Sequence, residues 1–273
     1  MFRNARVLIA IVVVTAVLPA SAEAWAPAAT ATIHPGVQTV TSGGQCTANF
    51  IYTAGGNTYI GQAAHCSSTG AATDTDGCLA ASLPLGTPVE ITGASRPGTL
   101  AYNSWLTMQA SGETNADTCA HNDLALVKID PADVGKVNPS VPGFGGPTGV
   151  GGASATGADV FSYGNSSLRL GITQLSPKRG IVVSTAGNGW SRTVYTVTPG
   201  IPGDSGSGFL NGSGQAIGVL STVALAPLAG SNGVGDLSRE LAYARAHGVS
   251  DLQVVNGTEP FTTDVVGAIL GAG

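Results

Sequence analysis

Charged residues are scarce in this 273-residue sequence: Asp, Glu, Lys and Arg together make up only 10% of it. Glycine is abundant instead, with 40 residues. Few charges and many glycines favour a chain of tight turns over a bundle of helices, and the length is sufficient for a sizeable core. We therefore expect an all-β protein rich in loops.

The sequence also lacks an uninterrupted apolar segment of the ~20 residues that a membrane-spanning helix needs. Its longest apolar run, from Val7 to Ala20, is shorter, follows two arginines and ends beside two small-residue cleavage sites. This pattern predicts a secretory signal peptide over residues 1–24, with cleavage after Ala22 or Ala24. The alternative is an uncleaved membrane anchor, for which the run is short. We expect a secreted, extracellular protein with no stable membrane insertion after cleavage.

Basic residues are especially few. Cleavage of the signal peptide would leave about 9 Lys and Arg against about 15 or 16 Asp and Glu, which is a net charge of about −6 or −7. Neutralising a phosphate backbone requires a basic stripe, and the sequence contains none. Nucleic acid is therefore not an expected partner.

Cysteine is limited to four residues, Cys46, Cys66, Cys78 and Cys119, all in the N-terminal half. In an exported protein they predict two disulfides, for which three connectivities are possible. No pair has the C-x-x-C spacing of a zinc site. Residues 74–77 resemble the start of a calcium-binding loop, but no downstream Glu completes the pattern. We expect no metal ion.

Short β-prone segments alternate with turn clusters along the chain. We predict strands over residues 49–53, 58–62, 88–92, 124–129, 159–163, 181–185, 193–197, 207–210 and 216–223. The Pro- and Gly-rich segment 136–152 divides these strands into two sets and predicts a connection between two β units. One helix is predicted, beginning after its cap Asp236 and ending at Gly248.

Three short motifs carry candidate catalytic residues. Glycines flank Ser205 in Gly203–Gly206, where they allow a sharp turn that presents both the Ser Oγ and its N–H. His65 is followed directly by a cysteine, and Asp123 stands where a polar cluster runs into an apolar strand. Each motif taken alone also has an ordinary structural interpretation. The Ser205 segment could be a simple β-turn, His65 could lie by chance beside a structural disulfide, and Asp123 could be a residue that ends a strand.

Together the motifs have a chemical logic. A Ser hydroxyl is a weak nucleophile until an imidazole accepts its proton, and the imidazole needs a carboxylate to fix its tautomer and stabilise its cation. Here the chain order is His, Asp, Ser. The Ser, acid, His order of the α/β-hydrolases would require Ser205, Asp236 and His247, but the glycine that ends their G-x-S-x-G motif is absent.

Segments 63–66, 122–126 and 203–206 resemble the three signature motifs of the chymotrypsin-like serine proteases. The likeness spans Cys46 to Val223. It implies that Ser205 is the nucleophile, His65 the general acid and base, and Asp123 the orienting carboxylate. The backbone N–H groups of Gly203 and Ser205 would form the oxyanion hole.

The resemblance also implies a fold of two six-stranded antiparallel Greek-key barrels with a C-terminal helix. The first barrel would span residues 25–135 and hold His65 and Asp123. Segment 136–152 would connect it to a second barrel over residues 153–235, which holds Ser205. Residues 236–273 would form the helix and a tail. The implied Cys46–Cys66 bridge leaves Cys78 and Cys119 as the second pair.

The implied activity is that of a secreted serine endopeptidase, a monomer that cleaves polypeptides through an acyl-enzyme and needs no cofactor. The base of its primary pocket would be Pro199, and its wall would be Ser221, Thr222 and Val223, with Val223 where Gly is common. No acid occurs at the base, so we expect cleavage after small or medium apolar residues, unless Asp236 reaches the pocket. The alternative is a non-catalytic binding protein on the same scaffold.

One departure from the family concerns activation. Many members neutralise the Asp before the nucleophile, here Asp204, with a newly cut amino terminus. This chain has no Lys or Arg between Arg6 and Arg96 and no Ile-Val-Gly-Gly sequence, so tryptic processing there is excluded. We expect an internal cation instead, and favour Arg169 or Arg192. The candidates in the second barrel are Arg169, Lys178, Arg179 and Arg192.

Overall fold

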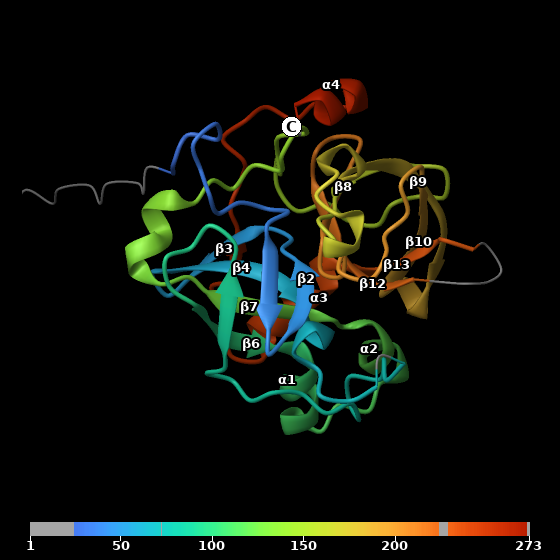
Figure 1. Ribbon diagram of the computed structural model, residues 1–273. Coiled ribbons are helices and arrows are strands. Elements are labelled where there is room, and N and C mark those ends of the chain that lie inside the picture. The colour runs from blue at the N-terminus through green and yellow to red at the C-terminus, as the bar shows by residue number, and fades with distance from the viewer. Residues whose placement is uncertain (1–24, 72, 224–228, 272–273) are drawn as a thin grey trace, which may run out of the picture.

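The computed structural model describes residues 25–71, 73–223 and 229–271, so the predicted signal peptide lies outside the described residues. Two β units lie side by side, with short helices around them (Figure 1). None of the helices in the described ranges is long and apolar enough to cross a bilayer.

The first unit is an eight-stranded sheet. Its strands are β1 (Gln38–Thr41), β2 (Gly44–Thr47), β3 (Ile51–Ala54), β4 (Asn57–Ala63), β5 (Pro88–Ile91), β6 (Gly98–Asn103), β7 (Leu124–Lys128) and β14 (Gln253–Val254), in the order β14-β3-β4-β7-β6-β5-β1-β2. Only residues 48–50 separate β2 from β3, although the two lie near opposite ends of this order, so the sheet curves round on itself.

This unit has eight strands and not the predicted six. One of the additional strands is β14, which the chain adds to the edge at β3 when it returns from the second unit, with Gln253 opposite Thr53. The hairpin of β3 and β4 turns at Gly55 and Gly56, both of which have positive φ. The alternating side chains of the strands fill a core that includes Ile51, Ile60 and Val127.

The second unit is a closed antiparallel barrel, and its six strands agree with the predicted number. They are β8 (Asp159–Tyr163), β9 (Pro177–Ala186), β10 (Ser191–Thr196), β11 (Gly208–Asn211), β12 (Ala216–Val223) and β13 (Asn232–Asp236), in the order β10-β13-β12-β11-β8-β9. The predominantly antiparallel architecture confirms the predicted all-β class.

Within the described ranges, four α-helices accompany the sheets. They are α1 (Ser104–Ser111), α2 (Ala116–His121), α3 (Leu237–Ala246) and α4 (Val265–Leu270). The predicted helix is α3, and the side chain of Asp236 caps it by accepting from the N–H of Arg239 at 3.0 Å. The sequence did not predict α1 and α2, which are capped by Asn103 and Asn115.

A shared core joins the two units. Phe144 of the Pro- and Gly-rich connection packs edge-on against Phe161 of β8, with ring centroids 5.5 Å apart. Phe50 of the first unit and Leu241 of α3 belong to the same buried cluster. Because the connection contributes buried aromatic area, it fixes the two units relative to one another and so fixes the cleft between them.

Candidate active site

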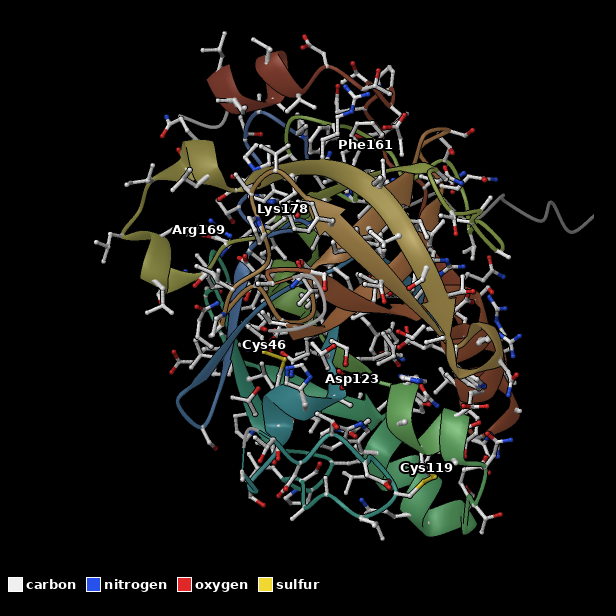
Figure 2. The ribbon with its side chains drawn as sticks, turned by 90° about the vertical axis from the view of Figure 1, so that its right-hand side faces the viewer. Cys46, Cys119, Asp123, Phe161, Arg169 and Lys178 are labelled. Carbon is white, nitrogen blue, oxygen red and sulfur yellow. A yellow bond between two sulfur atoms is a disulfide. The ribbon has the colours of Figure 1, made fainter. Side chains whose placement is uncertain are left out.

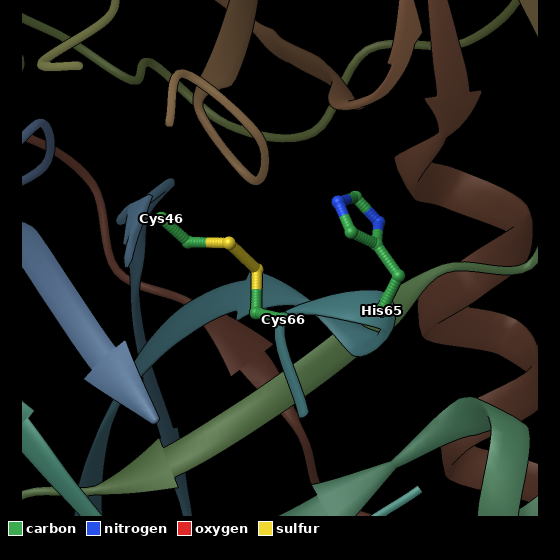
Figure 3. Close-up of side chains that lie close together, drawn as sticks. All are labelled: Cys46, His65 and Cys66. Carbon is green, nitrogen blue, oxygen red and sulfur yellow. A yellow bond between two sulfur atoms is a disulfide. The ribbon is translucent and has the colours of Figure 1, made fainter. Parts of the chain in front are cut away.

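His65 projects from a short 3-10 helix, Ala64–Ser67, at the end of β4. The helix is held from two sides. The N–H of Ala64 donates to the carbonyl of Asp123 at 2.8 Å, and Cys66 is bonded to Cys46 on β2, with 6.1 Å between their Cα atoms (Figure 3). The imidazole is therefore presented by a short segment with little freedom to move.

Asp123, the residue before β7, is bonded to His65 at two points. Its Oδ2 lies 2.6 Å from Nδ1 of the imidazole, and its Oδ1 accepts from the backbone N–H of His65 at 2.9 Å. Ser221 Oγ donates to the same Oδ2 at 2.6 Å. Only 3% of the Asp123 side chain is exposed, so its charge acts on the imidazole with little screening.

These contacts set the basicity of His65. Burial acts to lower its pKa, but the negative charge of Asp123 and the hydrogen bond to it act the other way. The net result is a pKa raised above the usual value of 6.5. Because Asp123 accepts at Nδ1, the other ring nitrogen, Nε2, is left to exchange a proton with a substrate or a nucleophile.

Ser205 lies in the loop between β10 and β11, on a turn that only glycine can flank. Gly203 and Gly206 have φ of +94° and +88°. A Cβ at Gly203 would lie 2.5 Å from Gln45 Oε1, and one at Gly206 would lie 2.7 Å from the carbonyl oxygen of Thr47. The turn is also anchored to the first unit, because the N–H of Thr47 donates to the Ser205 carbonyl at 2.8 Å.

The two amides predicted to form the oxyanion hole have no protein partner among the described residues. The N–H groups of Gly203 and Ser205 donate to no atom of the described residues, whereas the Gly203 carbonyl is held by Thr47 Oγ1 at 2.8 Å. Ser205 Oγ likewise has no hydrogen bond to a described residue, His65 included. Nucleophile and base contacts are often loose without substrate, so this geometry is compatible with catalysis.

His65, Asp123 and Ser205 line one cleft of about 800 Å³ between the two units. Three of the four predicted pocket residues also line it, namely Ser221, Thr222 and Val223. Pro199 is not among the described residues that line the cleft. Its carbonyl instead accepts from Arg169 Nη2 at 2.9 Å, so the structure does not bear out Pro199 as the base of the pocket.

Solved structures with this architecture are known. Protease A of Thermobifida fusca matches with a TM-score of 0.54 and 23% identity, over 82% of this chain and 99% of that one. The chain has the chymotrypsin-like fold. A glutamic acid-specific serine protease matches with 0.51 and 19%, over 82% and 100%, and Cellulomonas bogoriensis chymotrypsin with 0.50 and 18%, over 82% and 98%. No family model or curated sequence matches the chain.

Within the chymotrypsin-like fold, the buried Asp204 needs a cation, and the structure supplies two. Arg169 Nη2 lies 2.6 Å and Lys178 Nζ 3.1 Å from Asp204 Oδ2. The N–H of Ser166 donates to Oδ1 at 3.0 Å. Arg169 comes from the segment before β9 and Lys178 from β9 itself, so both cations belong to the second barrel (Figure 2).

These contacts decide between Arg169 and Arg192, the two favoured candidates for the cation that pairs with Asp204. Arg169 is confirmed, and Arg192 is wrong because it is buried beside Asp236, with which it forms an ion pair. Lys178 is the additional cation. Burial is the main cause that lowers the pKa of Lys178 to about 8, and the neighbouring Arg169 adds to it, while Asp204 opposes them. Arg169 therefore carries the permanent charge of the cluster.

Two alternative roles for Asp236 are wrong for the same reason. Its carboxylate is bonded to Arg192 and to the N-terminus of α3, so it does not enter the pocket. Nor does it pair with His247, whose Nδ1 lies 2.9 Å from the carbonyl of Tyr243 and whose ring stacks on Tyr243 at 4.0 Å. The α/β-hydrolase arrangement is therefore absent.

Both predicted disulfides are present. Cys78 and Cys119 are bonded with 5.2 Å between their Cα atoms, which ties the loop after β4 to α2. Within the described ranges, two groups of three side chains could offer ligands to a metal, Cys46 with His65 and Cys66, and Asp76 with Cys78 and Cys119. In each group both sulfurs belong to a disulfide and present no thiolate.

Proposed function

We propose that the protein is a serine endopeptidase that hydrolyses peptide bonds through an acyl-enzyme. One observation carries the proposal. His65 is hydrogen-bonded to the buried carboxylate of Asp123 at 2.6 Å and lines the same cleft as Ser205. Ser205 lies on a turn in which the N–H groups of Gly203 and Ser205 have no partner among the described residues. These groups support the proposal because acyl transfer from a peptide needs a base, a nucleophile and oxyanion donors close together.

Acylation follows from this arrangement. Ser205 Oγ attacks the substrate carbonyl carbon while Nε2 of His65 takes the hydroxyl proton. The carbonyl oxygen becomes an oxyanion and accepts from the N–H groups of Gly203 and Ser205. Asp123 stabilises the imidazolium that forms. When the tetrahedral intermediate collapses, the C–N bond breaks and the imidazolium gives its proton to the departing amine.

Deacylation repeats the sequence with water. His65 accepts a proton from the water that attacks the acyl carbon, and the same amides stabilise the second oxyanion. The bond between the acyl carbon and Ser205 Oγ then breaks, and the proton on His65 returns to Ser205. Ser221 contributes by holding Asp123 Oδ2 at 2.6 Å, which keeps that oxygen aimed at the imidazole.

The proposed setting is extracellular. Two disulfides are typical of proteins that fold in an oxidising compartment, and they agree with the predicted signal peptide. We propose that the mature chain is secreted and monomeric, that polypeptides are its substrates, and that it uses no cofactor. Arg169 and Lys178 supply the positive charge that Asp204 needs. The turn that holds Gly203 and Ser205 therefore does not depend on a newly cut amino terminus.

We further propose that the enzyme cleaves after small or medium apolar residues. The support is the wall of the cleft beside Ser205, where Thr222 and Val223 lie. The carboxylates that line the cleft in the described residues are Asp123, already bonded to His65 and Ser221, and Asp74, which accepts from the N–H of Ala71. Val223 is 40% exposed and presents its aliphatic surface to the cleft. A buried Lys or Arg side chain of the substrate would find no counter-charge there.

Peptide substrates that differ only in the residue before the scissile bond test this specificity. We expect kcat/KM for Ala, Val or Leu to exceed that for Arg or Lys by about tenfold or more. A Glu substrate belongs in the set, because one structural neighbour is a glutamic acid-specific protease. Faster hydrolysis after Arg, Lys or Glu would refute the proposed specificity but not the proposed reaction.

The pH dependence of hydrolysis should report His65. The imidazole must be neutral to accept the proton of Ser205, so kcat/KM falls as pH falls through its pKa, by about tenfold per pH unit. Because that pKa is raised, we expect the midpoint above pH 6.5. The measurement is kcat/KM for an uncharged peptide between about pH 4 and 9. A midpoint below the ordinary value for histidine would contradict the Asp123–His65 interaction.

Digestion of a peptide library tests the proposed activity as a whole. The purified protein should release peptides, and the Ser205→Ala variant should not. If the unchanged protein binds peptides from the library but cleaves none, the alternative of a non-catalytic binding protein is supported instead. The library also reports the residues preferred on both sides of the scissile bond.

A further inference from the structure

A second carboxyl group lies directly behind Asp123. Glu240 of α3 is completely buried, and its Oε1 accepts from the backbone N–H of Asp123 at 3.1 Å. Helix α3 thus holds the main chain at the start of β7, where the proposed orienting carboxylate is placed. A shift of this N–H would move both oxygens of Asp123 relative to His65.

The strand beneath the helix is shaped to admit this carboxyl group. Gly235 of β13 faces Glu240, and a Cβ at Gly235 would lie 2.5 Å from Glu240 Oε1. The same Cβ would lie 3.1 Å from the carbonyl oxygen of His121, two residues before Asp123. Any larger residue would therefore displace either the carboxyl group or the chain that leads into Asp123.

The surroundings of Glu240 disfavour a negative charge. The carboxylates of Asp123 and Asp236 both act on it, and the nearby Arg192 is already paired with Asp236. The other titratable groups that face it are the phenols of Tyr52 and Tyr102. Burial is the main cause that raises the pKa of Glu240 well above its usual value, and the charges of Asp123 and Asp236 add to it, while the hydrogen bond from the Asp123 N–H and the charge of Arg192 oppose the shift.

The second oxygen of the group leads to the same conclusion. Glu240 Oε2 is buried and has no hydrogen-bond partner among the described residues. As part of a carboxylate it would be a buried charged acceptor without a donor, which is costly. As part of a carboxylic acid the group is neutral, and Oε1 still accepts from Asp123.

We propose that Glu240 is a positioning residue for the protease reaction, a neutral carboxylic acid that holds the main chain of Asp123 in place without adding a second negative charge to the catalytic site. This inference rests on the proposed function. It adds that helix α3, which lies outside the three signature motifs, takes part in orienting His65 through Asp123.

The first test compares Glu240→Gln with Glu240→Met in the full chain, using kcat and KM across pH. Methionine has no acceptor for the Asp123 N–H, so kcat should fall about tenfold while KM stays within about twofold. Glutamine keeps the acceptor and the neutral state, and should restore both kcat and the pH midpoint. Full kcat in Glu240→Met would overturn the positioning role. A midpoint lowered by about 0.5 or more in Glu240→Gln would show that Glu240 is charged.

The second test needs no proteolysis, and it remains decisive if Glu240→Met does not fold or if the protein does not cleave peptides. Unfolding is measured in the Ser205→Ala background with Glu or Gln at position 240. A buried neutral Glu keeps a proton that the unfolded chain releases above its usual pKa of 4.5. The unfolding constant of the Glu chain should therefore rise, relative to the Gln chain, by about tenfold per pH unit from about pH 5 to 7. Parallel pH dependence would overturn the proposed neutral state.

Discussion

Replacing Ser205 with alanine should lower kcat/KM for peptide hydrolysis by about four to six orders of magnitude. The change removes the atom that forms the acyl-enzyme and leaves the oxyanion amides, so only residual catalysis by binding and electrostatics remains. His65→Ala should cost about as much, because an unassisted hydroxyl does not attack an amide at a useful rate. The double variant should be no worse than either single one, since the two residues act as a unit.

His247→Ala is the matched control for these variants. His247 is stacked on Tyr243, away from the cleft, so its removal should leave kcat/KM within about twofold of the original. The initial rates of hydrolysis of one peptide are measured for each variant and for the unchanged protein, and circular dichroism checks that each is folded. Loss of activity in His247→Ala together with retention in His65→Ala would show that the catalytic residues are assigned wrongly.

Arg169→Met should produce the second large effect. It removes the permanent cation from Asp204 and also the bond to the Pro199 carbonyl. Breaking a buried ion pair usually costs about 3–5 kcal/mol, and the remaining Lys178 should reduce the loss to about 2 kcal/mol or more. Because Asp204 lies between the two oxyanion amides in sequence, kcat/KM should also fall by about tenfold or more.

Arg179→Met provides the control for Arg169→Met. Arg179 is half exposed and pairs with the equally exposed Asp159 at 3.4 Å, so its loss should change the free energy of unfolding by about 0.5 kcal/mol or less. Chemical denaturation gives the unfolding free energies of both variants. Equal stability and equal activity of the two would contradict the role of Arg169 at the oxyanion turn.

The candidate site was predictable because each of its residues carries a local signal. Glycines flank Ser205, a cysteine follows His65, and Asp123 opens an apolar strand. The chain order of the three then distinguishes the chymotrypsin-like arrangement from the α/β-hydrolase one. The structure brings all three to one cleft, although the segments are far apart in sequence.

The charges around the site were only partly predictable. Arg169 and Arg192 both precede Ser205, and nothing local distinguishes them; the choice depends on barrel geometry, which buries Arg192 against Asp236 and Arg169 against Asp204. Glu240 carries no motif, and a charged residue on a short helix ordinarily faces solvent. Its burial becomes visible only when α3 packs on β12 and β13.

The missed elements have similar causes. Helix α1 has no regular apolar stripe from which the sequence could predict it. Of its eight residues, only Ser104, Trp105 and Met108 are buried. Its start is fixed by the side chain of Asn103, which accepts from the N–H groups of Trp105 and Leu106. Strand β14 is only two residues long and is stabilised by β3 rather than by its own sequence. Tertiary contacts decide such segments.

Covalent labelling with a fluorophosphonate, followed by peptide mapping, tests the central claim most directly. The reagent phosphonylates a serine only when a neighbouring base and oxyanion donors activate it. The account predicts one label per chain, on Ser205, formed in the unchanged protein and greatly slowed in His65→Ala. A label on any other residue, or peptide hydrolysis that continues after Ser205 is fully labelled, would contradict the account.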